Sequence, residues 1–193
     1  MSDGTLGQDT PHGPGPRRRK SLVLRALMLN GASVVVTLLL FALLLSLVAP
    51  PMGVNAPGAR MALWARLAVW PALVLFGMVV GVMAMRGRTQ AFNPIEDPES
   101  RGQRVAQRVL ANSVEQSAIF VPALAALVAT LPQPSLGAAV VATGLFVLGR
   151  LLFWAGYLLH PFARAPGMAM TLTVNLIVLG WAVLLQLGGV QPG

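Results

Sequence analysis

The sequence predicts an all-α membrane protein, and two observations predict this fold class. Hydrophobic residues make up 55% of the 193 residues and charged residues only 10%, whereas a soluble domain carries about 25% charged residues. The apolar residues also fall in long runs and do not alternate with polar ones, which is the pattern of helices whose solvent is lipid. An ordinary soluble domain is therefore excluded.

The N-terminal segment predicts a tail followed by one extra helix. Residues 1–20 are rich in glycine, proline and small polar residues and end in the basic run Arg17–Lys20, so we expect a disordered basic tail. The apolar run 26–49 is longer than the ~7–15 residues of a signal-peptide core. We therefore expect an uncleaved spanning helix and an outer loop over 21–60. A leader cleaved near Val54-Asn55-Ala56 is the alternative.

Four further apolar segments follow and predict a four-helix domain over 61–193. They cover 61–85, 105–131, 137–160 and 168–187. Each is long enough to cross a ~30 Å hydrocarbon core as a helix that rises 1.5 Å per residue. Prolines lie in the gaps between the segments, as expected where helices end and turns begin.

The distribution of basic residues predicts the orientation. Lysine and arginine are retained on the cytoplasmic side of short loops. One set of flanks carries ten of them and the other two; the ten are Arg17, Arg18, Arg19, Lys20, Arg25, Arg86, Arg88, Arg101, Arg104 and Arg164, and the two are Arg60 and Arg66. We therefore expect a multi-pass protein of the inner membrane with a cytoplasmic N-terminus.

Composition also excludes several functions. The absence of cysteine rules out disulfides, a catalytic thiol and cysteine-based metal sites. His12 and His160 do not form a pair with metal-ligand spacing, so we expect no metal. The net charge of +8 comes from arginines between apolar runs, without interleaved aromatic residues. Membrane topology explains this charge better than nucleic-acid binding does.

Polar side chains within the spans are the candidates for function, because ionisable groups in lipid are costly. At 100° per residue, a set on the third span shares one helix face within an arc of ~80°. Its members are Arg101, Arg104, Arg108, Asn112 and Glu115. Arg150 and Tyr157 share a face of the fourth span, and Asn175 lies at a comparable depth in the fifth.

We expect the side chains of Arg108, Glu115 and Arg150 to converge on a polar recess that opens to the cytoplasm. A cluster with more donors than acceptors suits an anionic, polar guest. Three simpler interpretations remain open. Arg101 and Arg104 can be topology charges, Asn175 can form a structural hydrogen bond between helices, and Glu115 can form a buried ion pair with Arg150.

These residues resemble the signature of the MAPEG superfamily, the membrane-associated proteins in eicosanoid and glutathione metabolism. The run from Arg108 through Asn112 and Glu115 to Phe120 and Pro122 is similar to the family's R-x3-N-x2-E pattern, which is followed by an aromatic residue and often a proline. Gly149-Arg150 and Tyr157 resemble the R-x6-Y segment of the next helix, and Arg164-Ala-Pro166-Gly167 precedes the last helix.

The resemblance, which covers about 61 to 188, implies a fold and an activity. The fold is a four-helix bundle, here with one additional N-terminal helix, assembled as a homotrimer. The activity is that of a transferase or peroxidase that uses glutathione as co-substrate on lipophilic electrophiles from the membrane. By position, glutathione binds Arg108, Asn112, Glu115 and Tyr157; Arg164 and Tyr157 are catalytic; and Arg104, Arg150 and Asn175 are supporting residues.

Departures from the family pattern keep two other functions open. Phe153 stands where several members have His or Tyr, and Met168 and Leu172 are apolar where some have Arg and Tyr. A thiolate needs a nearby cation or donor, so the missing groups favour, as the first alternative, a non-catalytic scaffold or interaction protein of the same fold. A small transporter is the second, because arginines within a membrane can line anion paths.

Overall fold

The computed structural model describes residues 16–89, 99–159 and 163–188, and within them the chain is all helical. The elements, in order, are α1 (Pro16–Leu47), α2 (Pro57–Thr89), α3 (Arg101–Thr130), the 3-10 turn η1 (Gln133–Ser135), α4 (Gly137–Leu159) and α5 (Ala165–Leu187). All five α-helices are long and apolar enough to cross a membrane. The predicted all-α membrane fold is confirmed.

Each helix extends over a predicted span and differs from it at the ends. The helices α1, α2 and α3 each include polar residues outside the apolar run, as in α2, which continues through Arg86 and Arg88 to Thr89. The helix α1 begins at Pro16, within the predicted tail. Residues 1–15 and His160 lie outside the described residues.

Local features explain the turn that precedes α2 and the two ends of α3. Gly53, in the turn between α1 and α2, has a φ of 73°, which only glycine adopts readily. The Ser100 hydroxyl accepts a hydrogen bond from the Gln103 backbone N–H and so caps the start of α3. At the other end of α3, Arg60 of α2 donates to the last carbonyls; its Nη1 bonds to the oxygens of Val128, Ala129 and Leu131 at 2.8, 3.2 and 2.7 Å.

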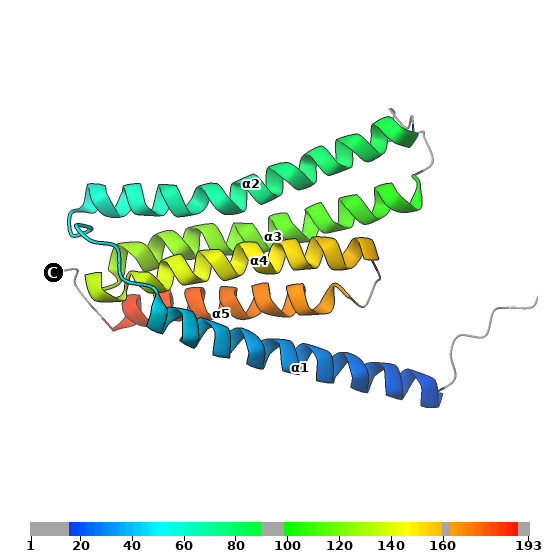
Figure 1. Ribbon diagram of the computed structural model, residues 1–193, viewed down its shortest axis with the longest axis horizontal. Coiled ribbons are helices and arrows are strands. Elements are labelled where there is room, and N and C mark those ends of the chain that lie inside the picture. Colours follow the sequence, from blue (N-terminus) through cyan, green and yellow to red (C-terminus); the bar gives the residue numbers. More distant parts are fainter. Residues whose placement is uncertain (1–15, 90–98, 160–162, 189–193) are drawn as a thin grey trace, which may run out of the picture.

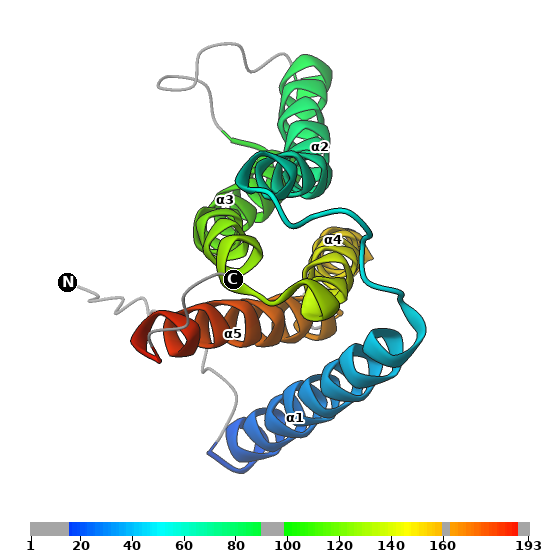
Figure 2. The same ribbon diagram turned by 90° about the vertical axis from the view of Figure 1, so that its left-hand side faces the viewer.

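The helices α2 to α5 form a bundle, and α1 lies outside it. Figure 1 shows α3 and α4 between α2 on one side and α5 on the other, with α1 beyond α5. The end view in Figure 2 shows the same order. The helices run alternately up and down, so the first residues of α1, α3 and α5 and the last residues of α2 and α4 share one end of the molecule.

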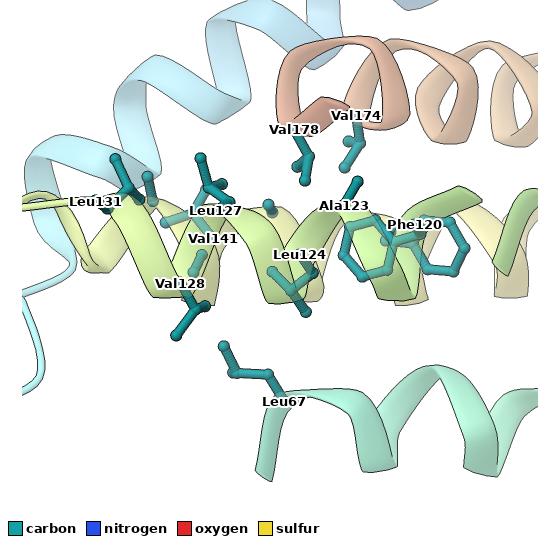
Figure 3. Close-up of a cluster of buried hydrophobic side chains, with 14 of the residues drawn as sticks. Leu67, Phe120, Ala123, Leu124, Leu127, Val128, Leu131, Val141, Val174 and Val178 are labelled. Carbon is teal, nitrogen blue, oxygen red and sulfur yellow. The ribbon is translucent and has the colours of Figure 1, made fainter. Parts of the chain in front are cut away.

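The largest hydrophobic core lies toward the other end of the bundle. It consists mainly of residues from α3, α4 and α5, and Leu67 reaches it from α2 (Figure 3). The rings of Phe120 and Phe146 stack within it with a centroid distance of 4.1 Å. A smaller hydrophobic cluster of Met78, Val109 and Phe153 lies nearer the end that carries the polar residues.

Two glycines bring α4 and α5 into close contact beside those polar residues. A Cβ atom added to Gly149 would lie 2.8 Å from Thr171 Cγ2, and one added to Gly167 would lie 2.6 Å from the Gly149 carbonyl oxygen. Small residues permit such close approach of spanning helices. The contact places the start of α5 directly against the α4 turns that carry Arg150 and Phe153.

Candidate polar pocket

Arg150 on α4 is the largest of the fully buried side chains that the structure describes, with only 1% of its surface exposed. Its Nη1 donates to Asn112 Oδ1 at 2.9 Å and to Ser113 Oγ at 3.4 Å on α3. Its Nη2 donates to Thr171 Oγ1 on α5. One guanidinium therefore joins three helices, which suits its planar, forked set of donors.

The surroundings of Arg150 hold it in one position. The Thr171 hydroxyl donates to the Gly167 carbonyl oxygen at 2.9 Å, which leaves its lone pairs to accept from the arginine. The guanidinium carbon also lies 4.6 Å from the centre of the Phe153 ring, a favourable cation–π distance. Arg150 thus supports its neighbours from within the bundle.

The contact with Arg150 determines which way the Asn112 carboxamide faces. Its oxygen accepts from the buried guanidinium, so its NH2 group is the part left for another partner. Asn112 is only partly buried. It can therefore donate to a carbonyl or carboxylate oxygen of a bound molecule.

Tyr157 and Arg164 form a second polar pair near the same end of the bundle. Arg164 Nη1 donates to the Tyr157 hydroxyl oxygen at 2.8 Å, and the guanidinium carbon lies 4.7 Å from the centre of the tyrosine ring. Tyr157 in turn packs edge-on against Phe153. The hydroxyl accepts from Arg164 and donates to no residue that the structure describes, so it can donate its own proton to a bound group.

These residues line one pocket of about 430 Å³. Its lining comes from four helices and the residue that precedes the last of them: Asn30 of α1, Arg108 and Asn112 of α3, Phe153 and Tyr157 of α4, Arg164 just before α5, and Ala165 and Met168 of α5. The volume falls within the range of small-molecule sites, ~300–1,000 Å³. The structure thus brings together Arg108, Asn112, Tyr157 and Arg164.

The electrostatics of the pocket favour an anion. Arg108 and Arg164 are both exposed on its walls, and the buried Arg150 lies behind Asn112. No carboxylate is among the residues that line it. A guest with two acidic groups would meet one guanidinium for each, in the bidentate manner that arginine allows.

Glu115 does not line this pocket. It lies on the exposed face of α3, and no ion pair joins it to Arg150 within the described ranges. The physical reason is the helix rotation: three residues at 100° each turn Glu115 about 60° away from Asn112, so Asn112 is partly buried beside Arg150 while Glu115 stays exposed. The expected approach of Arg150 to Glu115 is replaced by its contact with Asn112.

The other two candidates also lie away from the pocket. Asn175 is 4% exposed, and its Nδ2 donates to the backbone oxygen and to Oε1 of Gln116 at 3.1 and 2.8 Å. This is the interhelical hydrogen bond that was one of the two sequence-based interpretations. Arg104 is exposed and donates to the Glu99 carbonyl oxygen at 2.6 Å.

Sequence reasoning missed four residues of this region: Asn30, Ser113, Gln116 and Thr171. Ser113 and Gln116 stand beside Asn112 and Glu115, and 100° of helix rotation per residue turns them toward α4 and α5. Thr171 is recognisable only from the close approach of α4 and α5. Asn30 carries a signal, since it is the one carboxamide in the predicted first span, residues 26–49.

Comparison with known proteins identifies one family. The MAPEG family model matches residues 61–184, which include α3, α4, nearly all of α5 and every pocket residue except Asn30. The helix α1 lies outside the match. A comparison with curated proteins finds no match.

Proposed function

Because the chain belongs to the MAPEG family, we propose that it is a glutathione-dependent transferase or peroxidase that acts on lipophilic electrophiles. The observation that carries the proposal is the pocket in which Arg108, Asn112, Tyr157 and Arg164 meet. Its polar groups are predominantly donors, and its exposed charges are positive. Both properties suit a small anionic peptide such as glutathione.

In this proposal the tripeptide is bound by charge and by peptide recognition. Arg108 takes one of its two carboxylates, and the NH2 group of Asn112 donates to a carboxylate or peptide oxygen. Arg150 does not touch the guest; it holds the Asn112 carboxamide in the orientation that leaves this donor available. The pocket thereby selects for a polar molecule at a depth where lipid would otherwise be the solvent.

The Tyr157–Arg164 pair is proposed to stabilise the sulfur of glutathione as a thiolate. The thiolate, and not the thiol, is the nucleophile. Arg164 donates to the Tyr157 oxygen, which leaves the phenolic proton for a hydrogen bond to sulfur. The thiolate then attacks an electrophilic carbon; the S–C bond forms and the leaving group departs with its electron pair. The proton of the thiol is released to water.

A homotrimer completes the proposal. Glu115 is an exposed carboxylate within a spanning helix, and a carboxylate that faces lipid is costly. Docking of a second copy of the chain on this face of α3 would cover it. There Glu115 could take up the ammonium group of glutathione, the role that the family resemblance implies. The lipophilic electrophile would enter from the bilayer.

The charge distribution supports a cytoplasmic mouth for the pocket. The end of the bundle near Arg164 carries the first turns of α3 and the last turns of α2, with Arg86, Arg88, Arg101 and Arg104. The positive-inside rule assigns this end to the cytoplasm. We propose an inner-membrane protein that receives glutathione from the cytosol.

Binding and conjugation assays on the purified protein test this function. We expect the wild type to bind glutathione and to conjugate an aryl halide. Arg108→Ala should weaken binding by about 10- to 100-fold, the loss of charge-assisted hydrogen bonds. Arg101→Ala, on the same helix and outside the pocket, should bind as the wild type does. A wild type that does not bind glutathione, or an unchanged Arg108→Ala, would contradict the proposal.

A non-catalytic family member is the second candidate, and the lining of the pocket favours it at one point. Phe153 and Met168 occupy wall positions without a donor for sulfur, which leaves thiolate stabilisation to Tyr157 and Arg164 alone. Glutathione binding by the wild type without turnover of any electrophile tested would favour this candidate over the enzyme.

A further inference from the structure

The pocket has one wall that lies outside the family match. Its Asn30 belongs to α1, whereas the match begins at residue 61. The other residues that line it come from α3, α4 and α5 and from Arg164 just before α5. The additional helix therefore contributes to the same pocket as the bundle does.

The geometry of α1 directs Asn30 toward the bundle. From residue 24 on, where burial is described, Thr37 and Phe41 are the buried residues of α1. Asn30 precedes Thr37 by seven residues, which places it on the same helix face. Beyond the end of α1, the Val48 carbonyl oxygen lies 3.1 Å from a Cβ added to Gly137, so this end of the helix packs tightly on α4. Figure 1 shows α1 diverging from α5 toward its other end.

Asn30 differs from the other uncharged polar side chains of this helix. Ser33, Thr37 and Ser46 each donate to a carbonyl oxygen of α1 itself, at 2.7 Å. The Asn30 carboxamide makes no hydrogen bond to any residue that the structure describes. Asn30 is exposed in the single chain and belongs to the apolar span Leu24–Leu47. A polar group there is costly without a partner, and the pocket that it lines can hold one.

The other acceptor oxygens among the side chains that line the pocket already accept one hydrogen bond each. Arg108 and Arg164 are donors only. Asn112 Oδ1 already accepts from Arg150, and the Tyr157 oxygen accepts from Arg164. Two carboxamide oxygens line the pocket, those of Asn30 and Asn112. No described donor is bonded to the Asn30 oxygen. A peptide guest carries N–H groups that need such an acceptor.

We propose that Asn30, supplied by the additional helix α1, is a binding residue of this pocket that accepts a hydrogen bond from an N–H group of the guest. Arg108 and Asn112 then take the oxygens of the guest, and Asn30 takes its N–H. The pocket would thus distinguish a peptide from a simple dicarboxylate. The identity of the guest as glutathione rests on the proposed function above.

Glutathione affinity of the full-length protein in lipid nanodiscs tests the role. We expect Asn30→Leu to weaken binding about five- to tenfold, the cost of one hydrogen bond to a polar partner. Ser46→Leu, the same kind of change farther along α1, should bind within about twofold of the wild type. Glutarate, which has two carboxylates and no N–H, should bind Asn30→Leu as well as it binds the wild type.

Cross-linking tests the placement of Asn30 separately. The chain has no cysteine, so Asn30→Cys combined with Ala165→Cys offers one pair of thiols across the pocket. We expect a short bis-maleimide to link this pair within one chain. It should not link Ser46→Cys to Ala165→Cys.

The outcomes separate the two proposals. If the wild type binds glutathione and Asn30→Leu binds equally well, or if the Asn30→Cys/Ala165→Cys pair does not cross-link, the role of Asn30 is refuted and the proposed function stands. A wild type that does not bind glutathione refutes both.

Discussion

Arg150 does not line the pocket but positions Asn112, which does. It contacts α3 and α5 at once, and its bond to Asn112 turns that carboxamide toward the guest. Lysine offers a single ammonium and cannot reproduce two divergent donor directions. We expect Arg150→Lys to lower glutathione affinity at least fivefold, measured by titration calorimetry, because the Asn112 amide is no longer held. Arg66→Lys, at an exposed position of α2, serves as the control. Equal affinities in the wild type, Arg150→Lys and Arg66→Lys would argue against this positioning role.

In the proposed function, the Tyr157 hydroxyl lies next to the sulfur of glutathione. Tyr157→Phe keeps the ring over Arg164 and removes the hydroxyl. We expect glutathione to bind within about twofold of the wild-type affinity, because the other contacts remain. The conjugation rate at neutral pH should fall about tenfold and recover at alkaline pH, since the thiolate then forms without a donor. A pH–rate profile identical to that of the wild type would exclude Tyr157 from this role.

Much of the pocket could be predicted from residue spacing, and the remainder depends on tertiary packing. The spacing of Arg108 and Asn112 on one helix, together with the family-like positions of Tyr157 and Arg164, predicts residues that do line it. Spacing along one helix cannot show which part of its surface a neighbouring helix covers. The spacing therefore predicts Glu115 beside Arg150, whereas Glu115 lies on the exposed surface of α3, outside the pocket. Thr171 and Asn30 join the region only because α5 and α1 pack where they do.

At the level of the helices, hydropathy predicts the five spans but not their ends. Helices extend beyond the apolar run when a capping residue or a proline starts them. Ser100 caps the start of α3. Pro57 is the first residue of α2, a position where the backbone N–H that proline lacks would have no partner in the helix. These extensions matter for function. They carry α3 and α5 to the end where Arg101, Arg104 and Arg164 stand.

The contact between α4 and α5 is expected to be intolerant of added volume. Gly167→Ala would drive a methyl group into the Gly149 carbonyl and the Phe153 backbone. We expect a loss of about 1–3 kcal/mol in the free energy of unfolding, the usual cost of overpacking, measured by denaturant unfolding in detergent. Gly144→Ala is the matched control, because nothing lies within 4 Å of its added Cβ; alanine should stabilise that helix. The opposite ranking would refute the close packing of α4 and α5.

For the whole molecule, the exposed Glu115 predicts self-association. An isolated chain leaves this carboxylate on the outer surface of α3, which is unfavourable in lipid. We expect native mass spectrometry from mild detergent to show a homotrimer, and we expect Glu115→Leu to change its stability because that face then needs no polar partner. A wild type that remains monomeric under all detergent conditions would refute this assembly.

The central claim is that a peptide thiol binds among Arg108, Asn112, Tyr157 and Arg164. A structure of the full-length protein in nanodiscs, determined with glutathione at saturating concentration, tests it most directly. The account predicts density for the tripeptide in this pocket, with a carboxylate at Arg108 and the sulfur near the Tyr157 hydroxyl. Density for glutathione at another place, or a lipid chain filling this pocket in its presence, would contradict the account.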